Sequence, residues 1–506
     1  DFSLNFSRQV KELHYLFGFL SYSLDETTYE ENIYKAEGFP SDRMNSIFFA
    51  RQYAEDTKPQ GAESTTRNIG VNAVFNYSYD DRLLFDATFR TNASSQFGAN
   101  QRWGNFWSLG AGWNMHNEKW LRSKEWFSRL KLRASVGSTG SQGNNAYQSL
   151  ATYNYSEKNY ENKLGAYLMG MENKDLKWQK KMDYNVGMDM SVKNNFNLVF
   201  DYYQSTTENL LVAFTLPPST GFTTVQENVG KVRNTGIELS MSYMVLSHPQ
   251  DRTFLTLSLR AAHNKNRVVK ISDSMKAYNE KMDEMAESDS KLVTKYYDGV
   301  SMNAIWAVRS LGIDPATGRE IYLTKDGVST YEYRAEDMVV CGDNLPKLRG
   351  SFGINLGYKG FGLNVMCMYE LGAKMYNETL VDRVENVNMS YAVDKRVLEG
   401  RWQKPGDKVR FRSLKQVWDP EKQAYKVDEK TYATSRFVQK KNELNISSIN
   451  FSYDFFRHAF VKKMGMERLS VAFYMNDVAK LSTIKTERGL SYPFARNYNF
   501  SLQMTF

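Results

Sequence analysis

The 506-residue sequence has no long apolar run. Two of its longest apolar stretches, NLLVAF and YLFGFL, are far shorter than the roughly 18 to 20 residues that a membrane-spanning helix needs. This shortage excludes helical membrane spans. It does not exclude a membrane-spanning β-barrel, because the strands of such a barrel alternate apolar with polar residues and escape hydropathy windows.

Cysteine and histidine are also scarce. The two cysteines, Cys341 and Cys367, give neither a disulfide framework nor a metal-ligand spacing, and the five histidines are scattered. The sequence has no G-x-S-x-G, H-E-x-x-H, P-loop or EF-hand pattern. We therefore expect no metal, no other cofactor and no enzymatic activity. A barrel enzyme would need a Ser/His/Asp or Asp/His set on neighbouring strands, which so few histidines disfavour.

A signal peptide is missing at Asp1, where the chain opens directly with the alternating stretch DFSLNF. Either the N-terminus was processed or the chain is part of a larger protein. The net charge of +8 is ascribed to solvated loops. The alternative is attraction to an anionic surface, so lipid and lipopolysaccharide are expected partners and nucleic acid is not.

Aromatic residues, by contrast, are abundant. They make up 14% of the chain, while the mean hydropathy is only −0.56. This combination indicates apolar residues diluted by polar ones at every second position. The final stretch, RNYNFSLQMTF (496–506), shows the pattern clearly, because Tyr498, Phe500, Leu502, Met504 and Phe506 alternate with polar residues. A strand this regular has one polar and one apolar face.

The alternation recurs along the whole chain and predicts an all-β fold with about 15 strands. Asx and Gly residues between alternating runs, as at Asp80-Asp81, Asn194-Asn195 and Lys359-Gly360, predict hairpins. The predicted strands cover 2–9, 13–23, 67–79, 82–92, 104–115, 128–138, 182–193, 196–209, 232–246, 253–264, 349–359, 361–372, 443–456, 467–477 and 496–506.

The predicted connections alternate between short turns and long excursions. The four excursions span 24–66, 139–181, 265–348 and 373–442. Short turns on one side and long loops on the other are typical of a bacterial outer-membrane β-barrel, with the short turns in the periplasm. A soluble β-sandwich is the alternative, but it would not need so many long strands with one alternation phase.

The alternation also predicts which residues share a face. We expect Phe75, Phe85, Leu198, Leu363 and Phe500 to face lipid, and Asn76, Asp86, Asn197, Asn364 and Asn499 to face the lumen. In one strand the phase slips, since Leu444 and Ile446 are out of step with Ile449 and Phe451. A β-bulge is therefore expected near Ser447-Ser448.

Several stretches resemble segments of SusC/RagA-type TonB-dependent transporters, in the order found in that family. These stretches are LKLRASVGSTGSQGNNAYQS (130–149), NKDLKWQKKMDYNVGMDMSV (173–192), ENVGKVRNTGIELSMSY (227–243), IWAVRSLGIDPATGREIY (305–322), RWQKPGD (401–407) and RGLSYPFARNYNFSLQMTF (488–506). The resemblance implies an outer-membrane importer with an N-terminal plug, energised through TonB and covered by a surface lipoprotein of the SusD type. It also implies that Tyr498, Phe500 and Phe506 belong to the signal read by the barrel-insertion machinery.

The sequence departs from the family pattern in one respect, because the plug, the TonB-contacting segment and the early strands are absent. Plugged transporter barrels have 22 strands. We therefore interpret residues 1–506 as a C-terminal portion of such a barrel, with about seven strands and the plug supplied by a separate chain or by upstream sequence. An odd count of 15 strands predicts that Asp1 lies at the cell surface.

Aromatic residues in the excursions are candidates for substrate contact, because flat rings can stack on sugars. The candidates are Tyr147, Tyr167, Trp178, Trp306, Trp402 and Trp418. Loop packing and the aromatic girdle at the membrane interface are the alternatives. The leading functional hypothesis is import of oligosaccharides. Import of oligopeptides is the second, and a structural or enzymatic barrel ranks lower.

Overall fold

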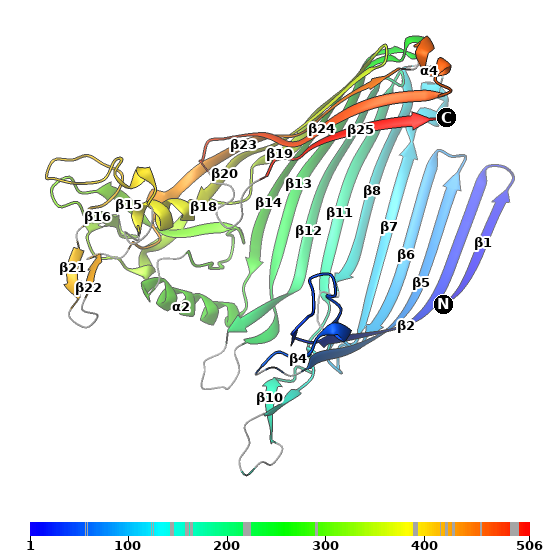
Figure 1. Cartoon of the computed structure of the whole chain (residues 1–506). Coiled ribbons are helices and arrows are strands. Elements are labelled where there is room, and N and C mark those ends of the chain that lie inside the picture. Colours follow the sequence, from blue (N-terminus) through cyan, green and yellow to red (C-terminus); the bar gives the residue numbers. More distant parts are fainter. Residues whose placement is uncertain are drawn as a thin grey trace. The chain divides into compact units, whose positions relative to one another are not determined.

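The computed structural model consists mainly of one large antiparallel sheet. It describes residues 1–55, 57, 59–122, 124, 126–141, 146–156, 161, 165–215, 224–288, 292–387, 393–414, 416–419, 424–427, 431–455, 458–485 and 495–506. The sheet has 15 strands, which lie side by side in chain order (Figure 1). They are β1 Phe2–Val10, β2 His14–Ile33, β5 Gln60–Tyr79, β6 Leu83–Ser94, β7 Trp103–Asn114, β8 Phe127–Ser141, β11 Gln179–Val192, β12 Phe196–Thr215, β13 Thr224–His248, β14 Thr253–Lys270, β19 Leu348–Tyr358, β20 Phe361–Tyr376, β23 Val438–Asp454, β24 Arg468–Ser482 and β25 Tyr498–Thr505.

Each predicted strand corresponds to one of these, so the all-β prediction is confirmed. The lengths differ mainly on the side of the excursions. The excursion predicted at 24–66, for example, begins as a continued ladder between β2 and β5 that pairs Leu24 with Ile69 and ends with Ile33 opposite Gln60. This extension has little apolar alternation, which is why the sequence did not show it.

The short hairpins are made by consecutive left-handed residues, as type I′ turns require. Asp80 and Asp81 both have φ of 49°, and Arg82 N donates to Tyr79 O over 2.9 Å. Lys359 and Gly360 have φ of 47° and 103°. These turns confirm the predicted hairpins. The turn predicted at 194–195 is displaced by one residue.

That displaced turn is centred on Lys193 and Asn194, whose φ angles are 46° and 57°. Asn195 N donates to Val192 O over 3.0 Å and closes the turn. Asn194 is therefore the second left-handed residue of the turn, and not the first as predicted.

The chain divides into two compact units. The first comprises residues 1–111, 135–183 and 207–229, and the second comprises 112–134, 184–206 and 230–506. In each unit the apolar residues of neighbouring strands lie opposite one another. In the second unit one row runs through Leu363, Phe451, Phe473 and Phe500, while the adjacent polar row contains Asn364 and Asn499.

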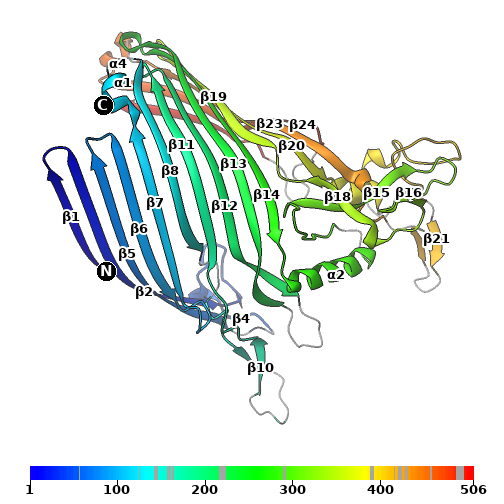
Figure 2. The ribbon, with the colours of Figure 1, turned by 180° about the vertical axis from the view of Figure 1, so that it is seen from behind.

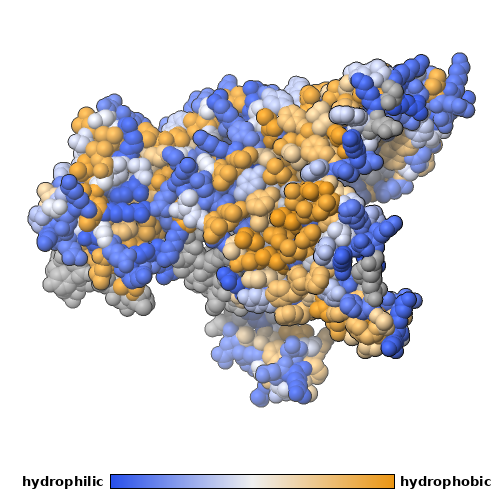
Figure 3. Space-filling model, turned by 90° about the horizontal axis from the view of Figure 1, so that it is seen from above, coloured by the Kyte–Doolittle hydropathy of each residue, from blue (hydrophilic) through white to orange (hydrophobic). Residues whose placement is uncertain are grey.

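In the first unit, Phe75 pairs with Ala87 and Phe85 with Tyr77, while Asn76 lies opposite Asp86. The predicted division of these residues between an apolar and a polar face is thus confirmed. Figure 3 shows one face of the molecule, on which hydrophobic residues gather in a broad patch flanked by hydrophilic ones. The helices of the described part are all too short or too polar to cross a bilayer.

The predicted bulge in β23 is also confirmed. Met366 pairs with Ser448 and Cys367 with Ile446, so Ser447 is skipped in the register of the ladder with β20. The ladder to β24 shifts at the same place. Ser447 instead donates from its hydroxyl to Met366 O over 2.9 Å. The extra residue brings Leu444 and Ile446 onto the same face as Ile449 and Phe451.

The described residues in the excursions of the first unit form small hairpins. The two-residue strands β3 (Ala36–Glu37) and β4 (Gln52–Tyr53) enclose the 3₁₀ helix η1 (Ile47–Phe49), and β9 (Thr152–Ser156) pairs with β10 (Gly165–Gly170). Three of the shorter connections of the second unit carry short helices instead. These are η2 (Met115–Asn117), α1 (Lys119–Arg122), η5 (Pro249–Asp251) and α4 (Ala459–Lys463).

The two excursions of the second unit fold together into what we call the loop body, the described residues within 271–347 and 377–437 (Figures 1 and 2). The first excursion supplies α2 (Asp273–Ser288), η6 (Ala335–Asp337) and a four-stranded sheet in the order β17-β16-β15-β18. These strands are β15 Ala304–Ile313, β16 Glu320–Leu323, β17 Ser329–Thr330 and β18 Met338–Asp343. The second supplies α3 (Glu378–Leu380), the π-helix η7 (Val381–Glu385), η8 (Lys395–Val397), β21 (Gln416–Asp419), β22 (Ala424–Val427) and η9 (Ser435–Phe437).

Buried apolar residues from both excursions form a shared core in the loop body. Ile305 of the first excursion packs with Leu380, Val384 and Phe437 of the second. The loop body also contacts the sheet, since Lys374 of β20 donates to Cys341 O over 2.7 Å. The excursions are therefore a packed structure at the end of the strands and not independent loops.

Candidate functional site: a charged hollow on the polar face

The polar face of the second unit contains a hollow of about 590 Å³. It is lined by side chains of strands β12, β13, β14, β19 and β20. The strand registers explain how charges converge there. Glu238 lies opposite Ala262, Ala262 opposite Arg349, and Arg349 opposite Glu370, so one row of the ladder carries three charged residues. The next row places Arg260 between Ser240 and Ser351.

Two carboxylates of the hollow already have cationic partners. Asp201 accepts from Arg133 Nη2 over 2.7 Å, and the same guanidinium donates from Nε to Asp189 over 3.1 Å. Glu370 accepts from Lys441 Nζ over 2.8 Å. Both acids are thus neutralised within the sheet. In the described ranges, His, Cys, Asp and Glu side chains form no group of three or more that could hold a metal ion.

A ladder of asparagines continues the polar face from the hollow toward the loop body. Asn264 and Asn266 both donate to Asn234 Oδ1, over 3.2 and 2.9 Å. Tyr203 donates to Asn264 Oδ1 over 3.3 Å, and Met302 N donates to Asn266 Oδ1 over 2.9 Å. The polar face therefore offers amide groups next to charges, a lining suited to a polar solute.

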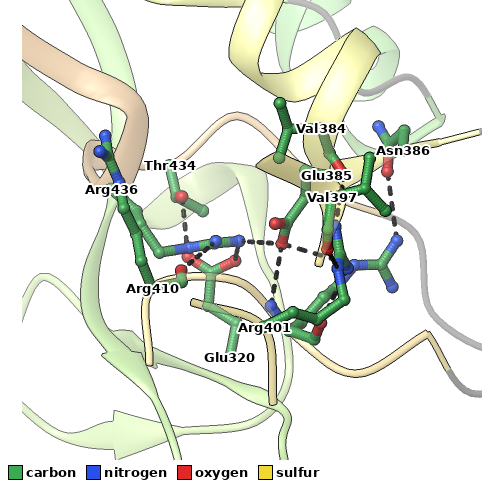
Figure 4. A network of polar contacts seen from close by, with 10 residues as sticks. Glu320, Val384, Glu385, Asn386, Val397, Arg401, Arg410, Thr434 and Arg436 are labelled. Carbon is green, nitrogen blue, oxygen red and sulfur yellow. Dashed lines mark hydrogen bonds and ion pairs between the residues drawn. The ribbon is translucent and has the colours of Figure 1, made fainter. Parts of the chain in front are cut away.

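A buried ionic network joins the two excursions in the loop body (Figure 4). Arg436 donates from Nη2 to Glu320 Oε2 and to Glu385 Oε1, both over 2.7 Å. Thr434 donates to the other oxygen of Glu320 over 2.8 Å. Arg401 donates from Nη1 to Arg412 O over 2.9 Å, and also to Val384 O.

Burial and the neighbouring charges shift the pKa of Arg436 in opposite directions. Burial lowers the pKa of its guanidinium, but the carboxylates of Glu320 and Glu385 outweigh that effect and leave the pKa raised. Among the described residues, Arg401 donates only to backbone carbonyls, and burial lowers the pKa of its guanidinium. The network therefore holds Arg436 firmly charged. It fixes residues that lie far apart in the sequence, and sequence reasoning gave no sign of it.

The aromatic candidates differ in their surroundings. Trp178 is 6% exposed, lies 4.3 Å from Phe97 between ring centroids, and donates to Arg102 O over 2.9 Å. Trp306 is also buried, in the core with Val308 and Met338. Both rings are thus packed against other side chains, as the alternative of loop packing describes, and their contact with substrate stays a prediction. A local pattern could not show which partners would cover them.

The other candidates lie in more open positions. Tyr147 accepts from Thr65 N over 2.8 Å, and Tyr167 is 54% exposed in β10. Trp402 is half-buried and donates to Pro315 O over 2.9 Å, which fixes the ring within the loop body. Trp418 lies in β21, but its side chain falls outside the described residues. The described residues that line the hollow include none of these candidates.

The C-terminal aromatics are all exposed. Tyr498 pairs with Met475 and Phe500 with Phe473 along β24. Phe506 follows the last strand and is 78% exposed. The apolar face of β25 is thus exposed along the strand.

Comparison with known proteins identifies the family of this chain. The model of the TonB dependent receptor-like β-barrel family matches residues 1–388. The chain belongs to this family. Its location is accordingly the outer membrane, as predicted, and the apolar face of the sheet is the one expected to contact lipid.

Similar proteins include further TonB-dependent receptors. TonB-dependent receptor P39 of Formosa agariphila is 24% identical over 94% of this chain and 48% of that protein. TonB-dependent receptor SusC of Bacteroides thetaiotaomicron is 28% identical over 56% of this chain and 29% of that protein. The chain thus spans about half the length of the relatives that match most of it. These relatives confirm the predicted resemblance to the SusC type.

Solved structures support the same fold. The RagAB peptide importer in its closed-closed state has a TM-score of 0.81 and 19% identity, over 100% of this chain and 55% of that one. A second structure, of the RagAB peptide transporter, has a TM-score of 0.78 and 19% identity, over 95% of this chain and 51% of that one. At this identity the likeness concerns the fold alone.

Proposed function

We propose that this chain is part of the barrel of a TonB-dependent importer that carries oligosaccharides across the outer membrane. The observation that carries the proposal is the hollow of about 590 Å³ on the polar face of the sheet, with the asparagine ladder beside it. Amide and charged groups on the polar face of the sheet can form hydrogen bonds to a hydroxyl-rich solute and release it during transport. The family consists of transporters, which also argues against an enzymatic role.

Oligopeptides are the second candidate substrate. Two solved structures with the same fold are of a peptide importer. Peptide amides would also pair with the side chains of Asn234, Asn264 and Asn266. The test compares a deletion strain with its parent for growth on defined oligosaccharides and on defined oligopeptides as sole carbon source. Loss of growth on oligosaccharides alone supports the proposal, and loss on oligopeptides alone replaces it.

We also propose that the loop body contacts a SusD-like surface lipoprotein that covers the barrel. The loop body is large and packed, and a membrane anchor would have no use for it. Exposed apolar side chains on its surface include Leu311, Val328 and Leu398, which are 58%, 62% and 71% exposed. Purification of the tagged transporter in mild detergent should recover this lipoprotein. Purification without it would contradict the proposal.

The remaining strands, the plug and the contact with TonB are proposed to come from sequence outside this chain. The strand order has β1 at one end and β25 at the other, and 15 is an odd number. An up-and-down barrel closed by hairpins needs an even number of strands. Sequencing all bands of the purified complex on a denaturing gel tests this, because the missing strands must appear in a longer chain or in a second one.

A further inference from the structure

The hollow has a charge imbalance among its lining residues. Arg260 and Arg349 are both exposed and both line it. Within the described part of the chain, neither guanidinium forms an ion pair or a side-chain hydrogen bond, whereas Asp201 and Glu370 are engaged by Arg133 and Lys441. The hollow thus offers two guanidinium groups that can bind a ligand.

The register shows that these two cations can act on one ligand. Arg260 of β14 lies opposite Ser351 of β19, so Arg349 is its diagonal neighbour on the same face. Diagonal neighbours in an antiparallel pair lie about 7 to 8 Å apart, within reach of long side chains. Two guanidinium groups on adjacent strands can therefore converge on one group between them.

The acids near the pair do not cancel this charge. Glu370 lies directly opposite Arg349 in the ladder, but its carboxylate binds Lys441 at 2.8 Å. Glu238 is the remaining acid of the hollow, two strands away from Arg349 across Ala262. One acid against two arginines leaves an excess of one positive charge.

We infer that Arg260 and Arg349 form an oxyanion-binding subsite, and that the imported oligosaccharide is acidic, carrying a carboxylate or a sulfate. The inference rests on the proposed function and specifies its substrate class. A guanidinium presents a planar fork of donors that matches the two oxygens of a carboxylate or sulfate. The neighbouring Ser240 and Ser351 leave space and add hydroxyl groups beside the fork.

The experiment measures binding to the full-length purified transporter by calorimetry, with three probes of similar size. The probes are trigalacturonic acid, the neutral maltotriose and the peptide trialanine. The variants are Arg260→Gln and Arg349→Gln. The matched control is Arg252→Gln, because Arg252 precedes β14, is paired with Asp454, and lies about 27 Å along the strand from Arg260.

The acidic trisaccharide should bind more tightly than the neutral one. Each glutamine variant should weaken it roughly tenfold or more, since a charge-assisted hydrogen bond is lost. Arg252→Gln should leave its affinity unchanged. Lysine at either position should restore part of the affinity, which separates lost charge from a folding defect.

Two results would overturn the inference. Equal affinity for the acidic and neutral trisaccharides, unchanged in both glutamine variants, would contradict the oxyanion subsite. It would remain consistent with import of oligosaccharides. Binding of trialanine with no binding of either saccharide would remove the oligosaccharide proposal as well. The two failures are therefore distinguishable.

Discussion

Arg436 donates to Glu385 over 2.7 Å, although the two residues lie 51 positions apart in the chain. Their side chains are 6% and 0% exposed. A buried pair of this kind is costly to break from one side, because the remaining charge stays buried without a partner. The pair therefore makes the packing of the loop body sensitive to a single side chain.

Replacement of Arg436 by methionine should destabilise the loop body by about 3 to 5 kcal/mol, since Glu320 and Glu385 would both lose their shared cation. Limited proteolysis of the folded transporter, with the cleavage sites identified by mass spectrometry, measures this as faster cutting within 271–347 and 377–437. The control is Arg334→Met, because the exposed pair with Glu332 contributes about 0 to 1 kcal/mol. Equal protease resistance of the two variants would contradict the prediction.

An arginine in place of Leu363 should cost roughly 2 to 4 kcal/mol, because Leu363 lies in the apolar row with Phe451 and Phe473. The neighbouring Asn364→Arg should cost far less, since that side chain belongs to the polar face. Folding of the full-length transporter into lipid vesicles over a denaturant series gives both values. The same cost at both positions would mean that the faces are wrongly assigned.

Removal of Phe506, or its replacement by aspartate, should lower the yield of assembled transporter more than it lowers synthesis. The motivation is the exposed aromatic that follows β25. Heat-modifiable mobility on gels reports the assembled fraction. Phe48→Asp is the matched control, because Phe48 is 91% exposed within an excursion hairpin. Unchanged assembly without Phe506 would rule out its role in the insertion signal.

Replacement of Trp178 by alanine should destabilise the first unit by roughly 3 to 5 kcal/mol, through the cavity left between Phe97 and Phe106. Tyr167→Ala should have little effect on stability, since that ring is 54% exposed. Thermal unfolding of both variants makes the comparison. A substrate-binding defect for Trp178→Ala at unchanged stability would argue for direct contact after all.

The sheet could be predicted from sequence because its evidence is local. Each strand carries its own alternation, and each tight turn carries residues that tolerate left-handed φ angles, such as Asp80 and Asp81. Even the bulge at Ser447 was predictable, because Leu444 and Phe451 differ in phase within one strand. Errors in strand length arose where alternation fades, as between Leu24 and Ile33 of β2.

The loop body could not be predicted in the same way, because its evidence is non-local. Glu320 and Arg436 lie 116 positions apart, and nothing in either neighbourhood indicates the other. In the sequence Trp306 resembles an exposed loop aromatic. In the structure it packs with Val308, Tyr322 and Met338. The hollow could be predicted from the sequence only in part. Its residues lie on predicted strands, but only the register shows that Arg260 and Arg349 are neighbours.

The bulge at Ser447 bears on how a gene for such a sheet can change over time. Asn445 pairs with Met368 and Asn450 with Asn364, so odd positions face the polar side before the bulge and even positions face it after. Deleting one codon in an uninterrupted part of a strand would exchange the two sides of all residues beyond it. Deleting Ser447 would remove the bulge and leave the apolar residues on both sides of it on one face. Single-codon insertions and deletions should therefore accumulate at this position among descendants of the gene, and be rare in the uninterrupted strands.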